Sequence, residues 1–283
     1  MWGQSSSGTT LRHKRTNKTT QNMKETMLPK VGRYQFVAEP FHCDFSGRLL
    51  MTHLGNQLLN AADFHSNDRG FGVKYLNTIN RSWVLSRLAV EMTEMPKIYD
   101  KFYVETWCDG ARHTFTSRNF AITAEDGRPF GFGKSIWAMI DTQTREPADV
   151  FSVNDGLIVD YVETAKECPI AKPNRVTVNG DAPLVRTIGT YYNDVDLNGH
   201  INSMKYVEHL LDLFDLEWYR SHRLKRFDIA YVAESHQGDD LCLYRQDEGY
   251  GSFAVKVMKK NADAPDGVEA CRCLLTFVDE QED

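Results

Sequence analysis

The stretch TYYNDVDLNGHINSMKYVEHLLDLFD (residues 190–215) decides the fold, because it joins a polar, strand-like segment to an amphipathic helix. Asp196, Asn198 and His200 recur at intervals of two, and residues so spaced in an extended segment point to one side. The apolar residues that follow recur with a helical period: Met204, Val207, Leu211 and Phe214. They predict a helix over residues 203–215, capped by Asn202 or Ser203. Three polar groups would then converge beside free N–H groups at a helix start, which suit a developing oxyanion.

Two other interpretations of this loop stay open. Asp194, Asp196, Asn198 and Gly199 fit the first positions of a calcium-binding loop, but Lys205 stands where that loop needs a bidentate glutamate. The same residues also fit an ordinary Asn-Gly turn with solvated acids. The spacing therefore indicates a candidate site without identifying its chemistry.

The chain on either side repeats one order of elements. The first half predicts a strand at 34–41, a helix with Met51, Leu54, Leu58 and Ala61 on one face, and strands at 82–92, 100–110, 114–123 and 133–141. A proline-containing linker at 163–183 precedes a strand at 184–192, the helix at 203–215, and strands at 227–234, 240–248, 252–260 and 269–279. Aligning the helix faces gives an offset of 153 residues, so we expect a duplicated α+β unit.

Composition excludes several classes of protein. The 283 residues are 41% hydrophobic, enough for a large core, and no run of eighteen apolar residues predicts a membrane span. The net charge is −6, and residues 1–24 carry +5, so the remainder carries −11 and broad nucleic-acid binding is disfavoured. Residues 1–24 are polar and basic, which predicts disorder; a transit peptide is the less favoured interpretation, because an amphipathic apolar face is lacking.

Familiar cofactor and nucleophile motifs are not supported. The six cysteines form no CxxC pair, so neither zinc nor a disulfide framework is indicated, and a reducing cytoplasm fits best. The run ending Gly131-Phe132-Gly133-Lys134-Ser135 approaches a phosphate-binding loop, but Arg128 stands in place of its first glycine. No Gly-x-Ser-x-Gly motif supports a serine hydrolase. We therefore expect neither a metal nor another cofactor.

Several separated motifs, in order, resemble the acyl-acyl carrier protein thioesterases of plants and bacteria. They are SWVLSRLAVEMTEMPK, VETWCDG and SRNFAIT…GKSIWAMIDTQTREP in the first half, then DVDLNGHINSMKYVEHLL and FDIAYVAES in the second. The resemblance covers roughly residues 30–280. It implies two tandem hot-dog units, each a long helix wrapped by a curved antiparallel sheet, with one active site in the second unit.

The resemblance also implies which residues form that site. Asp196, Asn198 and His200 match the family's catalytic triplet, and Glu234 matches the acid on the following strand. Ser235 stands where plant members often have cysteine, which favours carboxylate chemistry over a cysteine nucleophile. We expect Asp196 and Glu234 to activate water, with Asp196 as attacking group in a variant route. Asn198 would orient the water or the carboxylate, and His200 would position the thioester or assist proton transfer.

The implied substrate is a fatty acyl chain on the phosphopantetheine arm of an acyl carrier protein. Residues 31–165 would form the acyl-binding unit, residues 166–283 the catalytic unit and residues 1–30 a basic tail. The candidates for lining the acyl site are Met51, Leu54, Leu58 and Trp83. A basic patch of Arg220, Arg223, Lys225 and Arg226 is the candidate for docking the acidic carrier. An acyl-CoA thioesterase and a silent acyl- or carrier-binding module remain alternatives, and a homodimer is neither required nor forbidden.

Overall fold

The computed structural model describes residues 27–280, and each half of this region contains one helix packed on an antiparallel sheet. The first half comprises β1 (Gly32–Val37), α1 (Met51–Asp68), α2 (Val73–Leu76), β2 (Arg81–Met92), β3 (Lys101–Ala111), β4 (Phe115–Ala124) and β5 (Pro129–Asp141). The second comprises β6 (Leu184–Gly189), α3 (Ser203–Leu211), α4 (Leu216–Ser221), β7 (His222–Tyr231), β8 (Asp240–Gly249), β9 (Ser252–Asn261) and β10 (Ala264–Asp279). Short 3₁₀ segments lie at Pro40–His42, Asn77–Ile79, Val150–Tyr161 and Tyr192–Asp194.

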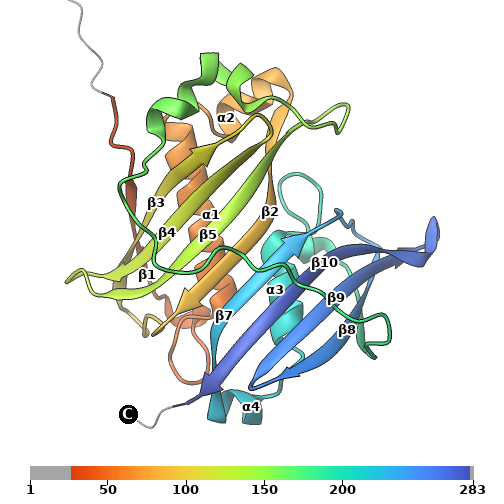
Figure 1. Ribbon diagram of the computed structural model, residues 1–283. Coiled ribbons are helices and arrows are strands. Elements are labelled where there is room, and N and C mark those ends of the chain that lie inside the picture. The colour runs from red at the N-terminus through yellow and green to blue at the C-terminus, as the bar shows by residue number, and fades with distance from the viewer. Residues whose placement is uncertain (1–26, 281–283) are drawn as a thin grey trace, which may run out of the picture.

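The ten strands form one continuous sheet in the order β1-β3-β4-β5-β2-β7-β10-β9-β8-β6 (Figure 1). Read outward from the centre, both halves have the same strand order. The halves join where β2 pairs antiparallel with β7, from Arg87–Ala230 to Glu91–Arg226. This confirms the predicted α+β fold with two tandem hot-dog units.

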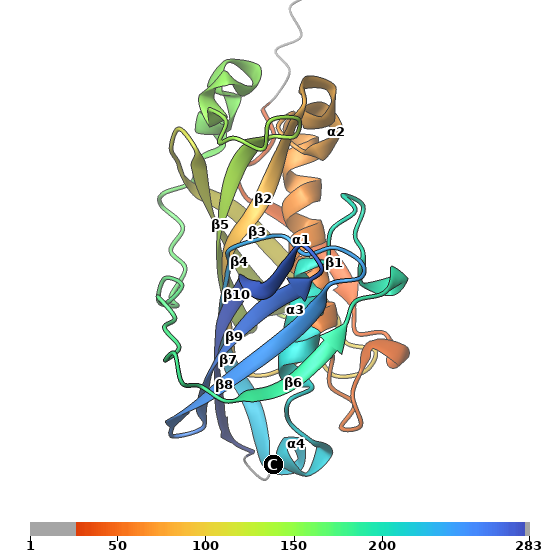
Figure 2. The same cartoon turned by 90° about the vertical axis from the view of Figure 1, so that its right-hand side faces the viewer.

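Both central helices lie on one side of the sheet, and the linker at 163–183 crosses the other side (Figure 2). The helix faces supply the core: Leu54, Leu58 and Val207 are fully buried among inward-facing strand residues. The two helices approach closely, because a Cβ on Gly55 of α1 would lie 2.1 Å from the Met204 Cε of α3. The sheet thus has a helix side and a linker side.

The second helix ends earlier than expected. The helix α3 ends at Leu211, and a separate helix α4 begins after Asp215, whose carboxylate accepts a hydrogen bond from the Trp218 N–H at 2.9 Å. Phe214 lies between the two helices, where its ring packs against Phe253 and Phe277. The apolar period continued past Leu211 because Phe214 is a core residue, although it is not helical.

The predicted basic tail lies mostly outside the described residues. Its last part is described: the Pro29 carbonyl accepts from Arg69 Nε at 3.1 Å, and Lys30 Nζ donates to the Val162 carbonyl at 2.8 Å. Across residues 27–280, no helix combines the length and apolar composition needed to cross a membrane.

Candidate active site

The turn from Asp196 to His200 is closed by its own hydrogen bonds. The Asp196 Oδ1 atom accepts from the backbone N–H groups of Asn198 at 2.8 Å and of His200 at 3.3 Å. The Asp196 N–H donates to the His200 carbonyl at 2.8 Å, and Gly199 has a φ of +81°, which glycine adopts without strain. The three polar residues therefore share one tight turn before α3, but Asp196 commits one carboxylate oxygen to holding it.

The first half contains the same turn. Asp44 Oδ1 accepts from the Ser46 N–H at 2.8 Å and from the Arg48 N–H at 3.2 Å, and Gly47 has a φ of +76°. Asp44 corresponds to Asp196 at an offset of 152 residues, which corrects the offset of 153 taken from the helix faces. A broad apolar helix face contains neighbouring residues, so aligning two such faces does not fix the offset to a single residue. The hydrogen bonds of the two turns fix it at 152. The turn therefore belongs to the duplicated fold, and Asn198 and His200 distinguish the second copy.

A second carboxylate reaches this turn from the end of β7. His200 Nε2 lies 3.4 Å from Glu234 Oε2, and the His200 ring meets the His236 ring edge-on, with 5.0 Å between the ring centroids. The other Glu234 oxygen, Oε1, forms an ion pair with Arg145. Arg145 follows β5, so the two halves of the molecule meet at Glu234. Both of its carboxylate oxygens thus face groups that favour their negative charge.

Neighbouring contacts fix the position of the turn. The Ile201 N–H donates to the Ser235 carbonyl at 2.9 Å, and Tyr231 Oη donates to the Ser203 carbonyl at 2.8 Å, so the end of β7 holds the start of α3. The Asn202 side chain caps α3 by accepting from the Met204 N–H at 2.8 Å. This confirms Asn202 as the cap, and it leaves fewer helix-start N–H groups for an oxyanion than expected.

Two sets of contacts bring the four expected catalytic residues together. Asp196, Asn198 and His200 share the turn, and Glu234 joins them through His200. The Asn198 amide Nδ2 lies 3.4 Å from Asp196 Oδ2, and the Asn198 side chain is exposed. His200 and Glu234 are partly buried, with side-chain exposures of 23% and 34%. The side-chain contact across the site is therefore between His200 and Glu234, with Asp196 beside it.

Sequence reasoning missed Arg145. The TQTREP motif was quoted only for the resemblance, although it held the available signal, an arginine in a turn directly after a strand. The Asp141 carboxylate shapes this turn by accepting from the Gln143 N–H at 2.8 Å and the Thr144 N–H at 3.0 Å. These hydrogen bonds, from Thr144 first, lower the pKa of Asp141. Arg145 itself has a φ of +65°, an uncommon conformation for a residue with a Cβ.

Ser235 is removed from the chemistry by burial. Its side chain is completely buried, and its carbonyl oxygen is occupied by the Ile201 N–H. A substrate carbonyl has no access to a hydroxyl in that position. This burial is a further argument against Ser235 as the nucleophile.

The residues expected to line an acyl site are in two different places. Met51, Leu54 and Leu58 belong to the main core under α1, where Leu54 and Leu58 have no exposed surface. Trp83 packs against a second hydrophobic cluster, and its Nε1 donates to the Phe71 carbonyl at 2.9 Å. An acyl chain beside α1 would have to displace well-packed side chains.

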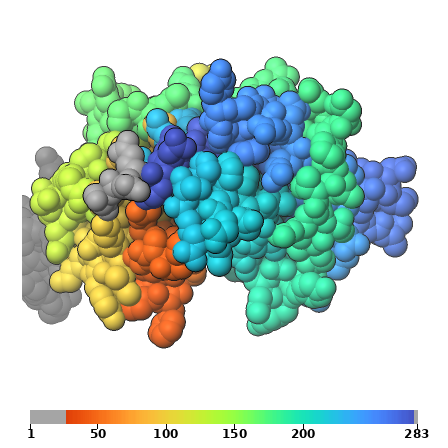
Figure 3. All heavy atoms as spheres, turned by 90° about the horizontal axis from the view of Figure 1, so that it is seen from below, coloured from red at the N-terminus to blue at the C-terminus, as the bar shows by residue number. Residues whose placement is uncertain are grey.

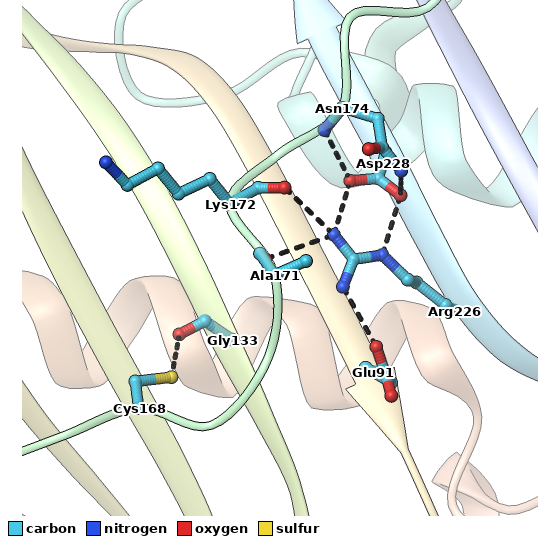
Figure 4. Close-up of polar contacts among 8 residues, drawn as sticks. All are labelled: Glu91, Gly133, Cys168, Ala171, Lys172, Asn174, Arg226 and Asp228. Atoms are coloured by element: carbon cyan, nitrogen blue, oxygen red, sulfur yellow. Dashed lines mark hydrogen bonds and ion pairs between the residues drawn. The ribbon is translucent and has the colours of Figure 1, made fainter.

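The predicted docking patch is corrected at Arg226. This residue is only 8% exposed, and its guanidinium is held by Asp228 and Glu91, with Nε 2.8 Å from Asp228 Oδ2 and Nη1 2.9 Å from Glu91 Oε2 (Figure 4). It also donates to the linker carbonyls of Ala171 and Lys172. Arg226 therefore fastens the linker to the sheet and is not an exposed charge.

Other members of the patch are close to Glu234 in sequence but lie at the opposite end of β7. Arg220 is in α4, which is on the surface at the foot of the molecule (Figure 3), and Lys225 is near the start of β7. Glu234 lies beyond the other end of β7, so it and Lys225 are at opposite ends of this strand. Proximity in sequence here does not mean proximity in space.

The calcium interpretation finds no support. Within residues 27–280, no group of three or more His, Cys, Asp or Glu side chains is arranged to hold a metal ion. Lys205, at the position where a calcium loop needs its glutamate, contacts Glu208 Oε1 at 2.9 Å. The loop is a five-residue turn followed by a helix.

Family models match both halves of the chain. Residues 30–155 match the acyl-ACP thioesterase N-terminal domain, and residues 181–277 match the acyl-ACP thioesterase C-terminal domain. A solved structure of an acyl-ACP thioesterase from Bacteroides thetaiotaomicron is 47% identical, covers 88% of this chain and 98% of that chain, and superposes with a TM-score of 0.80.

More distant plant proteins agree in fold. The structure of a 12:0-ACP thioesterase from Umbellularia californica is 19% identical, covers 90% of this chain and 100% of that chain, and has a TM-score of 0.77, a likeness that shows the fold alone. The chloroplastic dodecanoyl-[acyl-carrier-protein] hydrolase of Cinnamomum camphora is 27% identical over 196 residues, which cover 65% of this chain. The chain spans 50% of the length of that curated relative.

Proposed function

The chain belongs to the acyl-ACP thioesterase family, and we propose that it hydrolyses the thioester of fatty acyl-acyl carrier protein at the site formed by Asp196, Asn198, His200 and Glu234. The observation that carries this proposal is the contact of 3.4 Å between His200 Nε2 and Glu234 Oε2, which joins the turn of the second unit to the end of β7. Arg145 extends the contact into the first unit. One chain thus supplies every residue that the proposal needs.

The geometry favours His200 as the base. Both Glu234 oxygens face positive or proton-donating groups, which makes this carboxylate a good orienting partner. With a proton on Nε2 directed at Glu234, His200 keeps Nδ1 as an acceptor. Histidine is the side chain that most often serves as a general base in enzymes. This assignment differs from the expected water activation by Asp196 and Glu234.

The reaction follows from these roles. Water, losing a proton to His200 Nδ1, adds its oxygen to the thioester carbonyl carbon, and Glu234 stabilises the resulting imidazolium. Asn198 Nδ2 is the proposed donor to the oxyanion, an interaction typically worth about 3 kcal/mol. Collapse breaks the carbon–sulfur bond, and the departing thiolate takes the proton from His200. A thiol with a pKa near 8.5 needs little further assistance in leaving.

Asp196 is proposed to hold the turn in shape and to orient the bound water by accepting a hydrogen bond from it. Its Oδ1 accepts two backbone hydrogen bonds, as Asp44 does in a half without this site, so attack by Asp196 on the thioester is disfavoured. Oδ2 accepts from the Asn198 amide at 3.4 Å and has a second lone pair that can accept from the water. Asp196→Asn keeps an oxygen for the turn and tests whether the charge is required.

We propose that residues 31–165 receive the acyl chain and that residues 166–283 carry the chemistry. Binding beside α1 requires Met51, Leu54 and Leu58 to move, because they are packed in the main core, and Trp83 lies at a separate cluster. The close approach of Gly55 to Met204, whose neighbour Ser203 starts α3, supports this arrangement. A cytoplasmic location is part of the proposal. It is supported by the free state of the cysteines within residues 27–280 and by the bacterial source of the 47% identical relative.

The test is release of free fatty acid from acyl carrier proteins loaded with C8 to C18 chains, followed by mass spectrometry. We expect release by wild type, near-complete loss with His200→Gln, and no loss with His113→Gln, a matched change on an exposed histidine outside the site. Acyl-CoA with the same chains measures carrier preference. Folded wild-type protein that releases no fatty acid from any carrier-bound chain would contradict the proposed function.

A further inference from the structure

A basic cavity lies at the junction of the two halves, on the linker side of the sheet. Its volume is about 180 Å³, and its walls come from β2, the linker, the end of β7 and β10. The lining residues that matter here are Ser86, Arg87, Asn174, Arg175, Val232 and Arg272. Arg87 and Arg272 are each paired with Ala230, so both side chains project from the same face and flank a small residue.

Two of the three arginines in this cavity lack a counter-charge. Arg272 is neutralised by Glu269, with Nη2 2.8 Å from Oε2. Among residues 27–280, no partner forms a side-chain hydrogen bond or an ion pair with the guanidinium of Arg87 or of Arg175. Two unpaired guanidinium groups beside the polar side chains of Ser86 and Asn174 form a site for a small anion. Guanidinium forks match phosphate oxygens in geometry as well as in charge.

The cavity is next to the proposed active site. Pairing between β2 and β7 stops at Arg87 and Ala230, and beyond that point β2 continues to Arg81 alongside β5 alone. The two strands are therefore unpaired beyond Arg87 and Ala230, and on that side the Arg145–Glu234 ion pair connects the two halves. Val232, in the cavity wall, precedes Glu234 by two residues. The cavity is lined by the linker residues Asn174 and Arg175, and the linker crosses the side of the sheet opposite α3 (Figure 2).

We propose that this cavity binds the phosphate of the phosphopantetheine arm that carries the acyl chain. The inference rests on the proposed function, because that arm has a phosphate at one end and the thioester at the other. A phosphate anchored by Arg87 and Arg175 would place the arm near Glu234, which follows Val232 of the cavity wall by two residues. The cavity thus accounts for recognition of the arm at the junction, whereas the patch around Arg220 lies at the far end of β7.

Three substrates with one acyl chain separate the possible sources of affinity: acyl-pantetheine, which has no phosphate; acyl-phosphopantetheine, which has phosphate without protein; and acyl carrier protein. We expect the double variant Arg87→Ala/Arg175→Ala to raise KM about tenfold for the two phosphate-bearing substrates, with kcat retained, since a charge-assisted hydrogen bond contributes about that factor. KM for acyl-pantetheine should not change. Arg128→Ala, on an exposed arginine paired with Glu94 away from the cavity, is the matched control.

Several results would overturn this inference. An equal effect on all three substrates, or none, would show that the arginines do not read the phosphate. An effect on acyl carrier protein alone would assign them to the protein surface of the carrier. Calorimetry with acyl-free phosphopantetheine and with pantetheine tests the cavity without turnover, and equal affinity of wild type for both would also overturn it. Absence of hydrolysis with all substrates, combined with phosphate-dependent binding, would contradict only the proposed function.

Discussion

Arg145 is the residue through which the first half of the molecule acts on the proposed chemistry. Its ion pair with Glu234 joins residues 89 positions apart, and the Asp141 turn fixes its backbone. Both side chains are partly exposed, at 45% and 34%, so the pair should contribute at most about 1 kcal/mol. Its role is to orient Glu234, which in turn orients His200.

Arg145→Ala is therefore expected to lower kcat by up to about fivefold, because Glu234 loses one of its two partners. The kcat of Arg145→Lys should lie between those of Arg145→Ala and wild type, since an ammonium keeps the charge without the planar fork. Steady-state kinetics on acyl carrier protein measures both. The control is Arg128→Ala, which breaks an exposed arginine–glutamate pair with Glu94 away from the site. Equal kcat values for Arg145→Ala and wild type would show that the pair does not act on the reaction.

His65 makes the fold sensitive to acid. Its side chain is completely buried, and this burial, with the nearby charge of Arg118, lowers its pKa to about 3. An unfolded histidine has a pKa near 6.5. Between these values the unfolded chain binds a proton that the folded chain does not, so the free energy of unfolding falls as the pH falls from about 6.5 towards 3.

Urea unfolding of His65→Gln at several pH values between 7 and 4 should show a shallower loss of stability than wild type. The readout is the slope with pH, because the substitution also changes stability at neutral pH. The exposed His113 provides the control, and His113→Gln should retain the wild-type slope. Parallel curves for His65→Gln and wild type would assign the acid sensitivity to other groups.

At the scale of elements, the β2–β7 junction depends on a buried ionic network as well as on strand pairing. Arg226 joins β7 to Glu91 of β2 and to the linker carbonyls, and Asp228 beside it is only 1% exposed. Asn174 of the linker donates its N–H and its side-chain amide to Asp228, at 2.8 and 3.1 Å. The network thus binds β2, β7 and the linker together (Figure 4).

Removing Arg226 should leave the buried charge of Asp228 without its partner. We expect Arg226→Ala to lower the free energy of unfolding by about 3–5 kcal/mol in urea titrations. Arg220→Ala, which removes an exposed arginine paired with Glu217, should change it by less than about 0.5 kcal/mol. A loss below about 1 kcal/mol for Arg226→Ala would mean that water reaches Asp228 and compensates its charge.

Element positions followed well from sequence wherever alternation or a helical period was continuous. All ten strands were expected at the positions of β1 to β10, with boundaries that differ by a few residues. The break between α3 and α4 was missed, because Phe214 serves the core from a turn and so extends an apparent helical period. Arg226 was misjudged because its partners, Glu91 and the linker, are distant in sequence.

At the scale of the whole molecule, duplication supplied the architecture, and divergence between the copies supplied the site. The Asp44 and Asp196 turns have the same hydrogen bonds, yet the first copy has Ser46 and Arg48 where the second has Asn198 and His200. Sequence spacing predicted that the polar groups of the second copy converge, but it placed them on an extended segment, and the tight turn was the alternative interpretation. It did not predict that Arg145 would cross from the first unit, since that contact depends on how the two sheets join.

The central claim is that the pair of His200 and Glu234 activates water for thioester hydrolysis. Single-turnover hydrolysis of acyl carrier protein by wild type and Glu234→Gln tests it most directly, with Glu94→Gln as control on an exposed glutamate. The account predicts a fall of about a hundredfold or more in the chemical rate for Glu234→Gln, with substrate affinity and unfolding unchanged. A Glu234→Gln rate within a few-fold of wild type would contradict it.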